Sequence, residues 1–392
     1  MEHAIKTSFG ILPGTLKWGP YSTLVMATIG TVYTLLANFG GIGQGGGGGP
    51  VIWLTIAMIL IQIYSKSMSG ARVIDPINKS TDIIHVISYV DDNTLVQELK
   101  DTMGITEIIQ LMQQCIVKWK RLLQITGGDL ALQKCELAIL KWKWFGGKAV
   151  PVSKQMMPGD MMVDHNKLQR KEVHEGYKML GIRLTMSGDH KEEHVARMKQ
   201  SKNMGALLYR APTKPIDAFM IYNTRYLPAI RYPLTVMTFS EKELQEIQKP
   251  FVYLLLPKIG LNRHTLRAVV YAPYERGGLN FCALAHEQLV AQVKLMVGHV
   301  RRDDLLGRLY RVQMRVVQME LGIEKWFFRQ NPFDYEYLTD TSKLVYMWKE
   351  LRRYNINLYM DKEWTIPKQY QNDINIMDKA ISIPALTNMH LK

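Results

Sequence analysis

Two adjacent carboxylates, Asp91 and Asp92, have the chemistry of a site for a divalent cation. An apolar run, residues 83–89, leads into them, and a second short apolar run, residues 94–96, follows. Because Ile, Val and Tyr favour strands whereas Asp and Asn favour turns, the pattern predicts a β-hairpin with the carboxylates at its tip. Neighbouring carboxylates repel each other, and Mg²⁺ would neutralise them while water and phosphate oxygens complete its shell. A solvated acidic turn is the alternative interpretation.

A glycine-rich stretch, residues 41–49, precedes this hairpin and ends at Pro50. Glycine lets another backbone or a nucleotide approach closely. Pro50 suits the first turn of a helix, which residues 51–64 would supply. The N-terminus of such a helix can meet phosphate or sugar groups. No Gly-Lys-Ser/Thr follows, so the stretch is not a Walker loop, and a flexible linker is the alternative.

Short motifs in this order resemble those of a known family. Tyr89-Val90-Asp91-Asp92 is similar to the Tyr-Xaa-Asp-Asp signature of reverse transcriptases. Gly43-Gln44-Gly45 with Pro50 is similar to the Gln-Gly…Pro motif that precedes that signature. Gly277-Gly278-Leu279 resembles a segment found after the thumb of non-LTR (LINE-type) retrotransposon polymerases. The chain therefore resembles a non-LTR retrotransposon reverse transcriptase.

The resemblance implies an RNA-directed DNA polymerase that uses an RNA template, a DNA primer, dNTPs and Mg²⁺. Two Mg²⁺ ions would activate the 3′-hydroxyl of the primer and stabilise the leaving pyrophosphate. Asp91 and Asp92 would hold the metal, and Lys134 would act as a general acid toward pyrophosphate. An ordinary surface lysine is the alternative for Lys134. The residues expected to line the nucleotide and template site are Gln44, Gly45 and Tyr89.

Two downstream segments are expected to contact nucleic acid. Residues 176–184 resemble the hairpin that grips the primer strand, which implies a primer contact at Leu180 and Gly181. A capping-box-like pair, Asp189 and Glu192, predicts a helix that continues to about Arg210. Cations on this helix and in a later segment rich in aromatic residues suit a nucleic-acid backbone, with a solvated face as the alternative. The expected backbone contacts are Arg197, Lys199, Lys202, Arg263 and Arg267.

The composition favours a polyanionic partner. The chain has 392 residues with 49 Lys and Arg against 35 Asp and Glu, a net charge of +14. Such an excess suits nucleic acid or an anionic membrane. The three cysteines lie far apart, which predicts neither a disulfide framework nor a zinc site and favours a reducing compartment. We therefore expect an intracellular protein, in the nucleus or the cytoplasm.

No charged residue occurs from position 18 to position 65. Two apolar blocks, residues 21–39 and 51–64, lie in this run. The second is shorter than the ~20 residues that a membrane-spanning helix needs, and the first carries several polar residues. We expect both blocks to be buried and expect no membrane contact. A membrane-associated protein with a basic soluble domain is the minority hypothesis.

The expected fold is α+β. Residues 1–188 would form part of a right-hand polymerase palm, a small antiparallel sheet backed by helices. Helical spacing predicts a helix over residues 104–126. Residues 189–330 would form a mostly helical, thumb-like domain, in which Ser240 and Glu243 form a capping box for a helix over 241–256. Residues 331–392 would form a C-terminal tail of uncertain structure.

A complete two-ion site needs more carboxylate than one hairpin supplies. In the family a further aspartate comes from a strand before the glycine motif, whereas Glu2 is the only acidic residue before Gln44 in this chain. We therefore expect the fingers and the first catalytic strand to be absent, the metal site to be incomplete, and polymerase activity to be impaired or lost. A degenerate retroelement fragment that only binds nucleic acid is the alternative.

Overall fold

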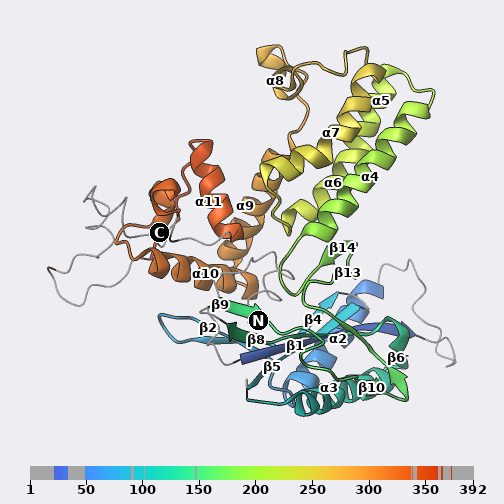
Figure 1. Ribbon diagram of the computed structural model, residues 1–392, viewed down its shortest axis with the longest axis vertical. Helices are drawn as coiled ribbons and strands as arrows, with labels where there is room; N and C mark the ends of the chain where they lie inside the picture. Colours follow the sequence, from blue (N-terminus) through green and yellow to red (C-terminus); the bar gives the residue numbers. More distant parts are fainter. Residues whose placement is uncertain are drawn as a thin grey trace. The chain divides into compact units, whose positions relative to one another are not determined.

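The computed structural model describes residues 22–33, 49–89, 92–100, 102–145, 148–336, 338, 342–360, 363–364 and 372. These residues form two compact units. The described residues up to Met179, with Thr185–Ser187, make unit 1, and Leu180–Leu184 with the described residues from Gly188 onward make unit 2. Helices and small, mainly antiparallel sheets occur together, which confirms the predicted α+β class (Figure 1).

Unit 1 is built around one large sheet with two helices. Its elements in chain order are β1 (Ser22–Tyr33), α2 (Gly49–Ser65), β2 (Ala71–Ile74), β3 (Thr81–Ile84), β4 (Val86–Tyr89), β5 (Asp92–Lys100), α3 (Ile105–Ile125), β6 (Gly128–Leu130), η1 (Leu132–Lys134), β7 (Glu136–Leu140), β8 (Trp142–Phe145), β9 (Lys148–Pro151), β10 (Met162–Val163), β11 (Asn166–Lys167), β12 (Gln169–Lys171) and β13 (Tyr177–Met179).

The large sheet has the strand order β12-β7-β1-β5-β4, with β6 paired to the end of β1. β1 pairs antiparallel with β5 on one side and with β7 on the other, and β4 pairs antiparallel with β5. The chain thus makes two interlocked split units, β1-α2-β4 around β5 and β5-α3-β7 around β1. The sequence of residues 1–40 is compatible with either helix or strand. Within this stretch, the β-branched residues of β1 suit the central strand that it forms.

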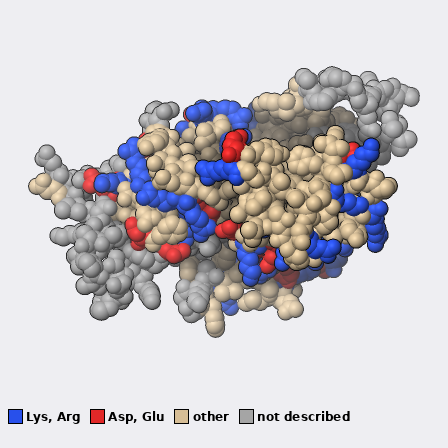
Figure 2. Space-filling model, turned by 90° about the horizontal axis from the view of Figure 1, so that it is seen from above, with Lys and Arg blue, Asp and Glu red and all other residues tan. Residues whose placement is uncertain are grey.

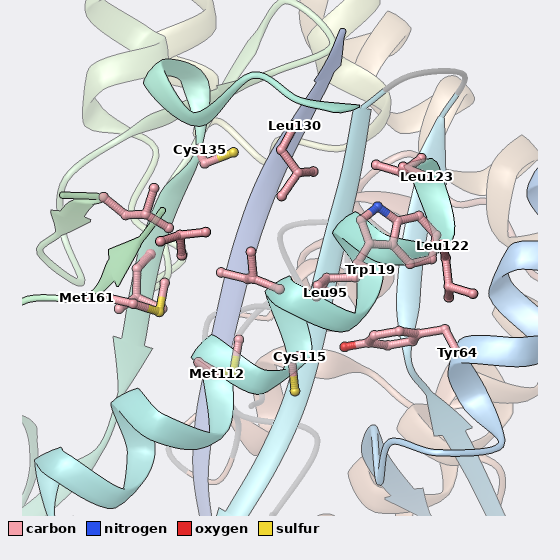
Figure 3. Packing of buried hydrophobic residues seen from close by; sticks show 14 of the residues in the cluster. Tyr64, Leu95, Met112, Cys115, Trp119, Leu122, Leu123, Leu130, Cys135 and Met161 are labelled. Carbon is pink, nitrogen blue, oxygen red and sulfur yellow. The ribbon is translucent and has the colours of Figure 1, made fainter. Parts of the chain in front are cut away.

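Both helices cover the same face of this sheet (Figure 1). Residues of β5 and β7 that point to this face pack against the apolar stripe of α3, and Tyr64 of α2 meets Trp119 of α3 edge-on, with ring centroids 5.4 Å apart. The helix predicted over residues 104–126 is confirmed as α3. Figure 3 shows the cluster that results, which includes Leu95, Met112, Cys115, Leu122, Leu123, Leu130, Cys135 and Met161.

The polar composition of residues 66–80 predicts a loop, but the segment contains strand β2, which pairs antiparallel with β3. The turn before β2 is fixed by Gly70, whose φ of +64° and close approach to His85 leave no room for a Cβ. The buried side chain of Gln97 accepts hydrogen bonds from Ser69 Oγ (2.8 Å) and from the Gly70 backbone N–H (3.2 Å). Gln97 is far from Ser69 and Gly70 in the sequence, so the polar residues of the segment itself do not reveal these contacts and indicate a loop.

Helix α2 confirms the helix predicted after Pro50. Leu60 and Tyr64 are buried, whereas Leu54 and Met58 are exposed. The expectation that residues 51–64 are buried is therefore correct for one face only, because a helix that lies on a sheet buries a single stripe. None of the helices in the described ranges combines the length and the apolar character required to cross a membrane.

Unit 2 is mostly helical. Its elements in chain order are β14 (Ile182–Leu184), α4 (Lys191–Arg210), α5 (Pro215–Ile221), η2 (Tyr222–Tyr226), α6 (Leu227–Arg231), η3 (Tyr232–Thr235), α7 (Glu241–Lys258), α8 (Arg267–Tyr271), η4 (Tyr274–Arg276), α9 (Leu284–Arg302), α10 (Leu305–Leu321), η5 (Phe327–Arg329), η6 (Pro332–Tyr335) and α11 (Lys343–Arg353).

The two predicted helix starts in unit 2 have different outcomes. The capping box of α7 is confirmed: Glu243 N–H donates to Ser240 Oγ (3.3 Å), and Ser240 N–H donates to Glu243 Oε2 (2.8 Å). A hydrogen bond to His190 and others from Ser240 lower the pKa of Glu243 to about 2. For α4 the predicted end at Arg210 is correct, but the N-cap is His190 and not Asp189. Asp189 lies one residue before the cap, and its carboxylate accepts from the Lys191 backbone N–H.

Buried glutamine side chains form hydrogen bonds with backbone groups of the loops in unit 2. Gln288 accepts from Phe239 N–H (3.0 Å) and donates to Phe239 C=O (2.8 Å). Gln292 donates to Met237 C=O (2.8 Å), and Gln318 donates to Ile323 C=O (2.7 Å). Each amide satisfies backbone groups that would otherwise be buried without a partner.

Helix α11 lies within residues 331–392, the stretch for which the sequence predicted no definite structure. Leu344, Met347 and Trp348 are buried in an apolar cluster with residues of α9, α10 and η5. Trp348 Nε1 donates to Gln330 C=O (3.1 Å). The apolar stripe of this helix is only three turns long, and the polar residues around it masked the signal.

Lys343, the first residue of α11, is fully buried, and its Nζ donates to the Thr235 backbone C=O (2.6 Å). Burial lowers the pKa of Lys343 from 10.5 to about 7. Between these two values the unfolded chain binds a proton that the folded chain does not, so the free energy of unfolding rises with pH.

We predict that Lys343→Met removes part of this pH dependence. Between pH 7.0 and 8.5 the free energy of unfolding of the wild-type chain should rise relative to that of the variant by about 1.5 kcal/mol, since the full slope of about 1.4 kcal/mol per pH unit is reached only above the folded-state pKa. Urea unfolding followed by circular dichroism at both pH values measures the difference. Equal pH dependence of the two proteins would mean that Lys343 is charged in the folded state.

Candidate active site

The predicted acidic hairpin is formed by β4 and β5, with Tyr89 directly opposite Asp92. Asp91, which precedes Asp92 in the sequence, lies outside the described residues, as do Gln44 and Gly45. One detail of the prediction is wrong. The entering run, residues 83–89, is not one strand, because β3 pairs with β2 and β4 pairs with β5, with His85 between them.

The register of three strands defines the surroundings of Asp92. On one side Asp92 is opposite Tyr89 of β4, and on the other side it is opposite Gly30 of β1. Side chains of a strand alternate between faces, and Asn93 and Leu95 belong to the face that α2 and α3 cover. Asp92 and Tyr89 therefore belong to the opposite face, where both are exposed.

Lys134 lies in the segment that returns to the same end of the sheet. β6 pairs with the last residues of β1, Thr31 opposite Leu130, immediately beyond the pairing of Gly30 with Asp92. η1 follows, and its last residue, Lys134, is exposed and two residues ahead of Glu136, which pairs with Thr28. The topology thus brings together the ends of three segments that are far apart in the sequence.

A site for two divalent cations needs more carboxylate than the described residues around Asp92 supply. Within the described ranges no group of three His, Cys, Asp or Glu side chains could hold a metal. Asp92 is exposed at the start of β5, with Asp91 next to it in the sequence, and the facing position on β1 is Gly30. One or two carboxylates suffice for a Mg²⁺ ion that keeps water and phosphate ligands, whereas a second ion would lack a ligand on β1.

The turn expected to contact a primer forms a hydrogen bond with a residue of α4. Leu180 and Gly181 follow β13, and both have positive φ (51° and 82°), a conformation that leucine rarely adopts. Arg197 Nη2 donates to Gly181 C=O (3.0 Å). The fully buried Glu193 pairs with Arg197 Nε (2.6 Å) and accepts from Arg183 N–H (2.8 Å).

The cations expected along a nucleic-acid backbone differ in their surroundings. Arg197 is used inside unit 2, in the contacts with Glu193 and Gly181. Lys199 and Lys202 are exposed on α4. Arg263 lies over the Tyr253 ring, 5.0 Å from its centroid, and donates to its hydroxyl (3.2 Å), and Arg267 is half-buried at the start of α8. In the view of Figure 2, Lys and Arg form several separate groups with fewer acidic side chains between them.

Sequence reasoning missed the structural pair of Glu193 and Arg197, although their spacing of four residues is the usual one for an ion pair on a helix. A second pair of adjacent carboxylates, Asp303 and Asp304, is interpreted from the sequence as a helix cap and ion-pair cluster. In the structure Asp304 caps α10 by accepting from Gly307 N–H (2.9 Å) and lies 2.7 Å from His299 Nδ1. Asp303 and Asp304 thus form a helix cap and an ion-pair cluster, as this interpretation predicts.

No family model matches the chain, and no curated protein matches it. The geometry of the sheet and of the individual residues is therefore the basis for the assignments that follow.

We predict that Glu193→Ala lowers the free energy of unfolding of unit 2 by about 3 kcal/mol, because it leaves the Arg197 guanidinium without its buried partner. Urea unfolding followed by circular dichroism gives this value. Lys199→Ala, at an exposed position of the same helix, should cost less than about 0.5 kcal/mol. Similar losses for the two variants would contradict a special role for the buried pair.

Proposed function

We propose that the chain is the RNA-directed DNA polymerase (reverse transcriptase) domain of a non-LTR retrotransposon, impaired in catalysis, and that unit 1 is part of its palm. The observation that supports this best is the pair of split β-α-β units. They bring Asp92, at one end of β5, beside the end of β1 and the segment of Lys134, on the face opposite to the one that α2 and α3 cover.

In this proposal the substrates are an RNA template, a DNA primer and a dNTP. Mg²⁺ bound at Asp91 and Asp92 would supply charge neutralisation at the triphosphate and a lower pKa for the attacking hydroxyl. Tyr89, opposite Asp92, would border the nucleotide with Gln44 and Gly45. Lys134 would donate a proton to the leaving pyrophosphate, and Leu180 with Gly181 would hold the primer backbone.

Impairment follows from β1. The strand contains no Asp or Glu, and its residue opposite Asp92 is glycine. Without a ligand from this strand, a second cation is held weakly and the reacting oxygens lose their alignment. A displacement of about 1 Å can lower a rate ~10²-fold.

Gly30→Asp should raise polymerase activity. Side chains of directly opposed residues begin about 5 Å apart, so the new carboxylate would complete the ligand set beside Asp92. We expect at least a tenfold increase in Mg²⁺-dependent primer extension on an RNA template, and loss of the product when Asp92→Asn is added. Gly30→Asn, similar in size but uncharged, should leave the rate unchanged. If neither the wild-type chain nor Gly30→Asp gives a product, the polymerase assignment is wrong.

Nucleic-acid binding without polymerisation is the second candidate function. It is favoured by the absence of a carboxylate on β1 together with the exposed Lys199 and Lys202 on α4. In this case α4 would follow a phosphate backbone, while Arg197 keeps its structural contacts with Glu193.

Replacement of both Lys199 and Lys202 by Gln should weaken binding of an RNA–DNA hybrid and make it less salt-dependent. Each lost phosphate contact lowers the slope of log affinity against log salt by about 0.9, so we expect a decrease of about 1–2. Fluorescence anisotropy between 50 and 300 mM NaCl measures the slope. Lys294→Gln with Lys325→Gln removes the same charge from other exposed positions of unit 2. An equal decrease in this control would show a non-specific charge effect.

A further inference from the structure

The β8–β9 hairpin carries a second set of residues suited to a ligand. β8 and β9 pair antiparallel as a two-stranded sheet of their own, with Lys143 opposite Val150 and Trp144 opposite Ala149. Alternation along a strand places Trp144 on one face of the hairpin and Lys143 with Phe145 on the other. None of these residues belongs to the proposed polymerase site.

The aromatic side chains of this hairpin are exposed. Trp144 is 59% and Phe145 is 78% exposed, and Val150 on β9 is 48% exposed. Large aromatic residues gain much free energy by burial, and neither ring stacks on another ring within the described part of the chain. Their exposure therefore indicates contact with a partner rather than a role in the fold of unit 1.

The net positive charge of residues 137–159 favours a polyanionic partner. No Asp or Glu occurs from residue 137 to residue 159, whereas four lysines do. Lys141 donates to Met103 C=O (3.3 Å) and Lys154 donates to Arg170 C=O (3.2 Å). Lys143 is exposed on the same face as Phe145, two residues away, a separation of about 7 Å along the strand.

We infer that the β8–β9 hairpin binds single-stranded nucleic acid. Unpaired bases stack on Trp144 and Phe145, and Lys143 contacts the phosphate next to the base on Phe145. Stacking on exposed aromatic residues next to cations is independent of base identity. A duplex does not fit this description, because its bases already stack on each other.

An anionic membrane is the other partner that Trp, Phe and Lys could meet. A membrane-surface element presents its apolar residues on one face and its cations on the other. Here the two aromatic rings are on opposite faces, and Lys143 shares a face with Phe145. This arrangement suits a flexible single strand of nucleic acid that contacts both faces of the hairpin, and it does not suit a flat lipid surface. The inference holds whether or not the Asp92 site is catalytic.

The test compares two labelled oligonucleotides of equal charge, dT20 and an abasic 20-mer, by fluorescence anisotropy with the full chain. We expect the wild-type chain to bind dT20 at least tenfold more tightly than the abasic strand. The double variant Trp144→Ala with Phe145→Ala should bind both strands equally, whereas Trp144→Phe with Phe145→Tyr should keep the preference. Lys143→Gln should weaken binding of both strands and lower the salt slope by about 0.7.

Phe333→Ala, at an exposed aromatic residue of unit 2, is the control and should leave the preference for dT20 intact. Circular dichroism should show the same fold for all variants, since the replaced side chains are exposed. Equal affinity of the wild-type chain for dT20 and the abasic strand would overturn the inference. So would a double variant that keeps its preference for dT20 but no longer sediments with vesicles of 70% phosphatidylcholine and 30% phosphatidylserine, because the hairpin would then be a lipid contact.

Discussion

The pairing of β1 with strands on both of its sides is the constraint on which unit 1 depends. β5 pairs along one edge, and β7 and β6 pair along the other. An isolated hairpin such as β4–β5 is at best marginally stable in water. β1 joins the β4–β5 hairpin to β7, and α2 and α3 pack on the sheet that results. Asp92 is therefore held close to the segment that carries Lys134.

Features specified by neighbouring residues could be predicted from the sequence. The β4–β5 hairpin, the stripe of α3 and the Ser240–Glu243 box each depend on residues that are close together in the sequence. Strand β2 was missed because a distant residue, Gln97, fixes the turn before it. The order of strands was likewise not predictable, since several pairing patterns are compatible with the same alternation of apolar residues.

The candidate site shows the same division. The motif around Asp92 identified an exposed carboxylate at a strand end, but only the register reveals that its neighbour on β1 is glycine. Arg197 was assigned to a phosphate backbone because helical spacing puts it near other cations. Its buried carboxylate partner also lies on α4, but helical spacing does not distinguish a side chain that pairs inside the protein from one that faces solvent. Exposed aromatic residues such as Trp144 become conspicuous only when burial is known.

The amides of Gln288, Gln292 and Gln318 give unit 2 a practical property. They join loops to helices through uncharged groups with very little solvent access. Dissolved ions screen charge–charge attraction but act little on neutral hydrogen bonds in a dry interior. Molar concentrations of sodium chloride, used to strip bound polyanions during purification, should therefore leave these loop attachments intact, so that nucleic-acid-free protein can be prepared without refolding.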